Sequence, residues 1–370
     1  MTEGAVSVAA AAGSPSAALR LALVPATEAA AWAQCLEAYE AAGGAVAVYH
    51  LPEWLQAHRA GSHFLLAATA PDGSCRCLCA ATISPTRAMP GHRVLWADRF
   101  QGGLEPQAEQ VVLGGIARLA ARQPRLLRAQ VRLLHCADER RRRWGQWLAA
   151  AGFTRCSQPR SYRMTAVVDL RPAEADIMAG FHATARRHIR AVAKHPVRIA
   201  PVADTAYAAR MEALLEETRR RTGGTFSAEM PTRLIDSAVR YPERIRILGL
   251  FRNDTAGPEA LLAFAAGYLH GDHAEYATAA STRGSDLKLA LGYGLAWELM
   301  RWAKAAGADW FDFGGITAGT HADAQDRLGG ISDFKRYFSQ DVREVAEEWL
   351  LEPSPVRARL AAFVRSVVLR

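Results

Sequence analysis

The stretch LALGYGLAWELMRWAKAAGADWFDFGGITAGTHADAQDRLGGISDFKRYF, residues 289–338, decides the predicted fold. Its first half carries apolar residues at helical spacing as far as Gly307, where a left-handed cap is expected to end the helix. Residues 310–313 then alternate like a short strand, and Gly314 and Gly315 follow directly. Because glycines at a strand end let the backbone approach a ligand closely, this stretch predicts a helix, a strand and a binding site in that order.

An ammonium group follows the predicted strand, at Lys335. Of the 45 Lys and Arg residues, only Lys194, Lys288, Lys304 and Lys335 are lysines. A lysine retained against such an arginine bias suggests a site that needs a compact charge rather than a planar guanidinium fork. Lys335 is therefore the first candidate catalytic residue, and the alternative is a surface lysine whose stem packs beside Phe334.

Length and composition predict a protein that buries a sizeable core. The chain has 370 residues, of which 50% are hydrophobic, and this favours two domains or more. The six cysteines form no CxxC pair, so buried thiols are favoured over a metal site or disulfides, and a reducing, cytoplasmic setting is expected. Residues 1–19 have an acidic start and are predicted to be a disordered extension rather than a signal peptide.

The net charge of +8 and the pI near 9.4 favour a polyanionic partner, such as RNA, an anionic membrane face or a phosphorylated substrate. The densest basic tract, residues 118–143, is a candidate footprint for a tRNA body, although a solvated helix face is the favoured alternative. A terminal helix from Pro355 is expected either to dock on the first domain or to contact the inner membrane face.

The order of predicted elements occurs twice along the chain. Each half has helices, a meander of strands, and then a helix, a strand and a helix, with a last strand near 342–350. Three consecutive strands joined by short turns imply antiparallel neighbours, so the order is similar to a GNAT acyltransferase unit used twice. We predict an α/β fold of the α+β type, with two tandem GNAT-like domains and a cleft between them. The first covers residues 20–165 and is completed by 340–370, and the second covers 166–339.

Several motifs resemble the FemABX family. WFDFGGI at 310–316 and ISDFKRYF at 331–338 look like the C-terminal hallmark of that family, and three other segments agree: ADRFQGGL at 97–104, AGFTRCSQPRSYRMTAVVDL at 151–170 and ARRHIRAVAKHPVRI at 185–199. The resemblance implies an aminoacyltransferase that moves an amino acid from aminoacyl-tRNA to an amine of a peptidoglycan precursor. It implies no cofactor and no metal, and its partners are aminoacyl-tRNA and a nucleotide-linked or lipid-linked precursor.

The implied reaction is aminolysis of the ester between an amino acid and tRNA, which passes through a tetrahedral oxyanion. The resemblance assigns Lys335 to stabilise that oxyanion or the phosphate at the tRNA acceptor end. Asp312 is a candidate to orient the incoming amine or accept its proton. The alternative, that this carboxylate caps glycine amides at a turn, is slightly favoured.

Residues 173–194 are predicted as one helix, on which Arg186, Arg190 and Lys194 form a ridge at spacings of four. This ridge is a candidate phosphate-binding site, and a solvated face is an equal alternative. The other candidate substrate-binding residues are Phe334, Tyr276, Tyr293, Gly314 and Gly315. For Tyr276, packing in the core or on a strand face is the favoured alternative.

Two other functions remain open. An acyl-CoA-dependent N-acyltransferase would use the helix start at Gly292 and Gly294, although Leu289 stands where a GNAT pyrophosphate loop favours a basic residue or Gln. A non-catalytic RNA-binding relic of the fold is the alternative from another class. The sequence does not specify the amino acid transferred, the acceptor amine or the oligomeric state.

Overall fold

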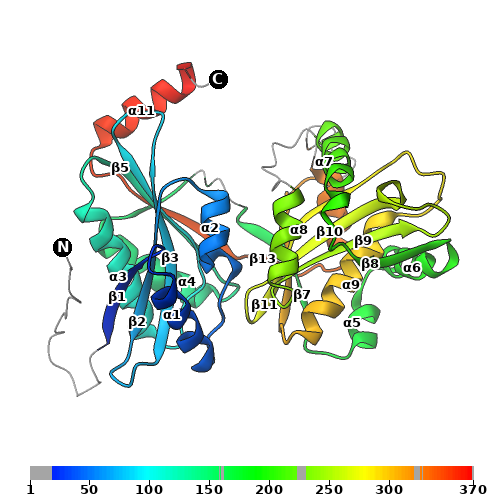
Figure 1. The fold of residues 1–370 in the computed structure, drawn as a ribbon, viewed down its shortest axis with the longest axis horizontal. Helices are drawn as coiled ribbons and strands as arrows, with labels where there is room; N and C mark the ends of the chain where they lie inside the picture. Colours follow the sequence, from blue (N-terminus) through cyan, green and yellow to red (C-terminus); the bar gives the residue numbers. More distant parts are fainter. Residues whose placement is uncertain are drawn as a thin grey trace. The chain divides into compact units, whose positions relative to one another are not determined.

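The computed structural model describes residues 19–157, 159, 162–222, 231–320, 326 and 328–368. The chain forms two compact units (Figure 1). The first contains Met1–Arg163 and Glu344–Arg370, and the second contains Met164–Arg343, so the end of the chain returns to the first unit. The extension predicted over 1–19 lies outside the described residues except for Leu19.

The first unit is built on a seven-stranded sheet of order β1-β2-β3-β4-β5-β14-β6. Strands β4 and β5 are parallel, and the other neighbours are antiparallel. The strands are β1 Arg20–Pro25, β2 Ser62–Thr69, β3 Cys75–Pro85, β4 Arg93–Phe100, β5 Leu126–Leu134, β6 Thr154–Arg155 and β14 Ala346–Leu351. The helices are α1 Ala29–Ala41, α2 Pro52–His58, α3 Pro106–Arg122, α4 Asp138–Ala150 and α11 Pro355–Val368.

The second unit repeats the plan with a sheet of order β13-β7-β12-β11-β10-β9-β8. Strands β8 to β11 form an antiparallel meander, and β11 and β12 are parallel. The strands are β7 Met164–Asp169, β8 Val197–Pro201, β9 Ile245–Arg252, β10 Leu261–Leu269, β11 His273–Ser281, β12 Trp310–Gly315 and β13 Val342–Glu344. The helices are α5 Glu174–Gly180, α6 Ala183–Ala191, α7 Ala208–Thr222, α8 Pro231–Arg240, α9 Leu291–Ala305 and α10 Gly329–Arg336, with a 3₁₀ turn, η2, at Val192–Lys194.

The helix and strand predicted within residues 289–315 are confirmed. Helix α9 buries Leu295, Leu299 and Ala303 in the core of the second unit, and Gly307 ends the helix region with a φ of +88°. The strand after it, β12, is buried on both faces as far as Gly314. The free cysteines at 75, 77 and 79 lie buried on β3, as their alternation predicted.

Two predicted elements are wrong. The single helix over 173–194 is broken at Phe181, which is buried and extended, and the His182 side chain accepts a hydrogen bond from Thr184 N at the start of α6. The single strand near 342–350 is two strands, β13 and β14, which belong to different sheets. The chain crosses from the second unit to the first between these two strands, and alternation alone does not show such a crossing.

A buried carboxylate organises the helices of the first unit. Glu109 on α3 is 1% exposed and accepts hydrogen bonds from Trp144 Nε1 at 2.8 Å and Arg143 Nη2 at 3.1 Å, both on α4, and another from Arg140. The amide of Gly103 also donates to it. Burial raises the pKa of this carboxyl, but the donors outweigh burial and hold the pKa below its usual range. The charge is thereby paired on several sides.

Glu109→Gln should destabilise the first unit by about 3 kcal/mol, because it leaves two partly buried guanidinium groups without their carboxylate. Thermal and urea unfolding of the two proteins measures the difference. Asp72→Asn is the matched control, since Asp72 is 65% exposed and its ion pair with Arg76 is 3.7 Å long. Equal stability of the Glu109 variant and the wild type would show that the cluster contributes nothing.

Candidate active site

The parallel strands of the second unit diverge. Strands β11 and β12 share three register pairs, which end at Glu275 opposite Asp312. Beyond them the register of β12 with β7 is irregular, and Gly314 adopts a φ of +71°. In the first unit the pairing of β4 with β5 extends from Arg93 to Phe100, the last residue of β4, with register shifts after Arg93 and between Ala97 and Phe100. The pairing of the parallel strands therefore ends after three residue pairs in the second unit and continues further in the first.

The ammonium of Lys335 lies where β11 and β12 diverge. Its Nζ donates a hydrogen bond of 2.6 Å to the carbonyl of Gly315. A Cβ placed on Gly314 would lie 3.8 Å from the Nζ atom. Within the described part of the chain, that carbonyl is the one hydrogen-bond acceptor that Nζ has. Since an ammonium carries three N–H groups, two remain for a substrate.

Burial changes the acidity of this ammonium. Lys335 is 8% exposed, and burial lowers its pKa to about 8, although the carboxylates of Asp312 and Glu275 oppose the shift. At neutral pH the group is therefore mostly protonated and is more acidic than an ordinary lysine. A buried ammonium of this kind can pair with negative charge that develops in a reaction, or give up a proton to it.

Asp312 is fully buried and supports the strand end. Its Oδ1 accepts hydrogen bonds from Thr165 Oγ1 at 2.6 Å and from Gly314 N at 2.7 Å. Thr165 Oγ1 also lies 2.8 Å from the carbonyl oxygen of Gly314, so the two acceptors share its one O–H group. This geometry is that of a turn-capping carboxylate, the alternative to direct contact with the substrate.

Glu275, which the sequence motifs did not single out, places a second carboxylate here. It is 5% exposed and lies directly opposite Asp312 on the neighbouring strand. Its Oε2 is 3.3 Å from Nε2 of the buried His270. Motif reasoning missed Glu275 because only the pairing of β11 with β12 brings it to the site.

Aromatic rings fix the helix that carries the ammonium. Phe334 contacts Tyr293 edge-on with ring centroids 4.9 Å apart, and it contacts Phe338 at 5.3 Å. The ring centroid of Tyr276, which is half-buried on β11, lies 6.4 Å from that of Phe334. His188 on α6 stacks on Tyr293 at 4.8 Å, a contact that sequence reasoning missed. These packed rings hold α10 against the sheet and so restrict the position of Lys335.

The predicted ridge of three cations does not form one surface. Arg186 donates hydrogen bonds to the carbonyls of Ala179 and Phe181, and so caps the end of α5. Arg190 and Lys194 are exposed and have no ion-pair partner among the described residues, but Lys194 belongs to the turn η2 rather than to α6. Two cations of the ridge therefore remain available to a phosphate.

Of the two glycines at the start of α9, packing explains Gly294. A Cβ on Gly294 would lie 2.8 Å from Val192 Cγ2 and 3.1 Å from Ile199 Cδ1, and one on Gly292 would lie 3.6 Å from the Phe334 ring. Close packing against η2 and β8 requires glycine at 294 whether or not a phosphate binds there. Gly294 therefore carries little weight for a coenzyme A site.

Most of the basic tract 118–143 is engaged within the first unit. Its ion pairs include Arg128 with Glu352 at 2.5 Å and Arg132 with Asp98 at 3.4 Å. Other pairs engage the arginines at 140–143. Arg118, Arg122 and Arg125 stay exposed without an ion pair among the described residues. The paired arginines favour the structural alternative over a tRNA footprint.

The described residues also hold no group of three or more metal-ligating side chains.

Lys335→Met should remove a pH-dependent cost of folding. Because burial lowers the pKa of Lys335 from 10.5 to about 8, the unfolded chain binds more protons between these values. The wild type should therefore gain up to about 3 kcal/mol relative to Lys335→Met as the pH rises from 8 to 10.5. Urea unfolding of both proteins across this range measures the difference, and a constant difference would contradict burial of the charge.

Comparisons with known proteins agree with this architecture. Residues 179–336 match the model of the acetyltransferase (GNAT) domain. The crystal structure of FemX aligns with this structure at a TM-score of 0.63 and 12% sequence identity. The alignment covers 83% of this chain and 90% of the FemX chain. The structure of L-PGS from Bacillus licheniformis aligns at a TM-score of 0.51 and 14% sequence identity, over 91% of this chain and 97% of the L-PGS chain. A search of the curated proteins gives no significant match. The predicted fold class and the resemblance are confirmed at the level of the fold: the chain has a FemX-like double GNAT fold.

Proposed function

We propose that this protein transfers an aminoacyl group from aminoacyl-tRNA to an amine on the stem peptide of a peptidoglycan precursor. The observation that carries the proposal is the buried ammonium of Lys335, with two N–H groups left for a substrate at the divergence of β11 and β12. The FemX-like fold supports the reaction class, and the resemblance at 310–316 and 331–338 supports the substrates. We place the reaction in the cytoplasm, where aminoacyl-tRNA is available.

The chemistry requires a positive charge where an oxyanion forms. The amine nitrogen of the acceptor attacks the ester carbonyl, a C–N bond forms, and the carbonyl oxygen becomes negative. The Lys335 ammonium pairs with this oxygen in a site of low water content, where such a pairing is strong. The C–O bond to the ribose then breaks, the ribose oxygen takes a proton from Lys335, and the proton shed by the new amide nitrogen restores the ammonium.

The two buried carboxylates act through Lys335 in this proposal. Asp312 is 0% exposed and already accepts hydrogen bonds from Thr165 and Gly314, so we assign it a positioning role rather than contact with the amine. Glu275 faces it from β11 and, like Asp312, raises the pKa of Lys335. Together they oppose the effect of burial and favour the charged form of the ammonium.

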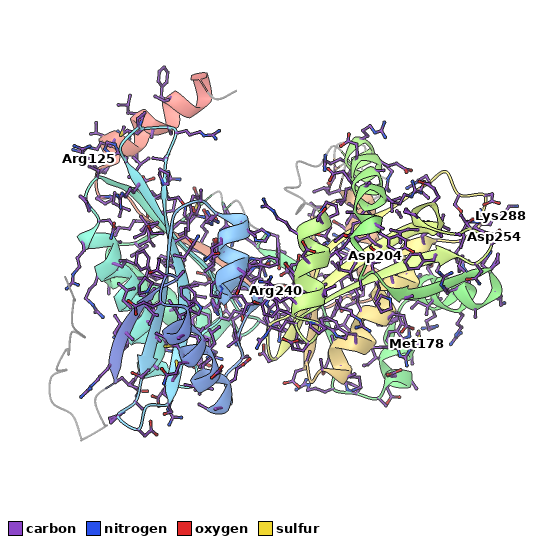
Figure 2. The ribbon with its side chains drawn as sticks, viewed as in Figure 1. Arg125, Met178, Asp204, Arg240, Asp254 and Lys288 are labelled. Atoms are coloured by element: carbon purple, nitrogen blue, oxygen red, sulfur yellow. The ribbon has the colours of Figure 1, made fainter. Side chains whose placement is uncertain are left out.

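Lys335→Ala should reduce kcat at least about 100-fold without unfolding the protein, because a donor to the oxyanion is lost. The assay incubates the protein with labelled aminoacyl-tRNAs and a nucleotide-linked or lipid-linked muropeptide, and scores the mass shift of the acceptor. Lys288→Ala is the matched control, since Lys288 is exposed in the same unit (Figure 2) and should leave turnover unchanged.

Normal turnover by Lys335→Ala would remove this residue from the mechanism. In the wild type, kcat should fall as the pH rises through about 8, since the ammonium is then lost. Acetyl-CoA is offered in a parallel reaction, because the GNAT domain match also fits an acyl-CoA-dependent N-acyltransferase. Acetylation of the acceptor without aminoacyl transfer would favour that second candidate. RNA binding without turnover in either protein would favour a non-catalytic relic.

Arg190→Ala and Lys194→Ala should each weaken binding of a phosphorylated substrate by up to about fivefold. An exposed ion pair contributes binding free energy of this size. Both cations are exposed on neighbouring turns of α6 and η2. Titration with the nucleotide-linked muropeptide and with tRNA measures each affinity, and Lys288→Ala again serves as the control. Unchanged affinity of both variants for both substrates would show that this face binds no phosphate.

A further inference from the structure

Helix α11 presents its large apolar side chains to solvent. Val356 is 76% exposed, Leu360 is 54% exposed and Phe363 is 63% exposed. Among residues 355–364 of this helix, whose side chains the structure describes, Ala358 and Ala361 are buried. A surface helix normally buries its large apolar residues and exposes small or polar ones. Helix α11 does the reverse.

The contact of α11 with its own unit uses small side chains. Ala361 packs with Val94 and Leu127, and Ala358 lines a small cavity with the same two residues. In Figure 1 this helix lies beside β5 in the first unit. Docking onto the first unit, which the sequence predicted as one possibility, is therefore present, but it leaves the bulky residues outside.

The exposed residues form one stripe with a cation on each side. At about 100° per residue, Val356, Leu360 and Phe363 fall within about 60° of each other around the helix. Arg357 lies on one side of this stripe and Arg359 on the other, and both are exposed without an ion pair among the described residues. The stripe and the two arginines are called the α11 surface below.

A third exposed cation lies at the same end of the unit. Arg125 immediately precedes β5, whose residues Leu127 and Arg128 contact α11, and Figure 2 labels it beside that helix. No helix of the described chain is long and apolar enough to cross a bilayer. The α11 surface thus combines a narrow apolar stripe with cations that have no acidic partner in the described part of the chain.

We propose that the α11 surface lies on an anionic lipid bilayer, with Val356, Leu360 and Phe363 among the acyl chains and the arginines at the headgroups. An amphipathic helix lies in the plane of a bilayer when its apolar side inserts and its basic residues pair with acidic lipids. An RNA backbone would pair with the arginines but leaves the apolar stripe in water. On the proposed function, this placement brings the enzyme to the membrane where a lipid-linked acceptor resides.

The test is flotation of the full chain with vesicles of phosphatidylcholine alone or with about 30% phosphatidylglycerol. Binding is expected to the anionic vesicles and to weaken in high salt. The double variant Leu360→Glu and Phe363→Glu should lower binding at least about tenfold with unchanged circular dichroism. Val239→Glu is the matched control, because Val239 on α8 is also exposed, at 56%, and should leave binding unchanged.

Two results would overturn the proposal. The first is failure of the wild type to float with anionic vesicles, or equal flotation of the double variant. The second is that the wild type forms a dimer in solution and binds no vesicles, while the double variant is a monomer. That result would assign the α11 surface to a second copy of the chain. The measurement uses no tRNA and no muropeptide, so its failure is distinct from failure of the proposed function.

Discussion

The Asp312 carboxylate holds three parts of the second unit in place. It accepts hydrogen bonds from the Thr165 hydroxyl on β7 and from the Gly314 amide at the end of its own strand, and its charge favours the ammonium of Lys335 on α10. A buried carboxylate costs several kcal/mol unless donors and an opposite charge compensate it. Here the donors and the ammonium provide that compensation, and the same ammonium donates a hydrogen bond to the carbonyl of Gly315 at the end of the strand.

The two units show how one plan can support different roles. In the first unit the parallel strands β4 and β5 pair as far as Phe100, with two register shifts, and the buried charge of Glu109 joins α3 to α4. In the second unit the parallel strands diverge after three pairs, and the buried charges lie at the opening. The buried carboxylate of the first unit is paired with arginines of a neighbouring helix, whereas the two buried carboxylates of the second unit act on the ammonium of Lys335. This difference is our reason for placing the candidate chemistry in the second unit.

Local patterns were sufficient to predict much of the fold. Apolar spacing and Gly307 predicted α9 and its end, and alternation predicted β12. The break at Phe181 was missed because its apolar side chain fits a helical pattern as well as an extended buried position. The boundary between β13 and β14 was missed because alternation does not show which sheet a strand joins.

The candidate site was predicted in part for the same reason. Lys335 and Asp312 lie within one continuous stretch, so motif and composition located both. Thr165, Glu275 and His188 reach the site only through strand pairing and helix packing across long separations. Nothing near these residues in the sequence indicates a partner, since the side chains that they contact belong to other elements.

Direct titration of the Lys335 ammonium tests the central claim most closely. The chain contains only four lysines, so selective isotope labelling of lysine gives few NMR signals, and the Lys335→Met variant identifies the one that belongs to this residue. A buried ammonium at the strand divergence predicts that this signal titrates near pH 8. Titration above about pH 10, the ordinary range of a solvated lysine, would contradict the account.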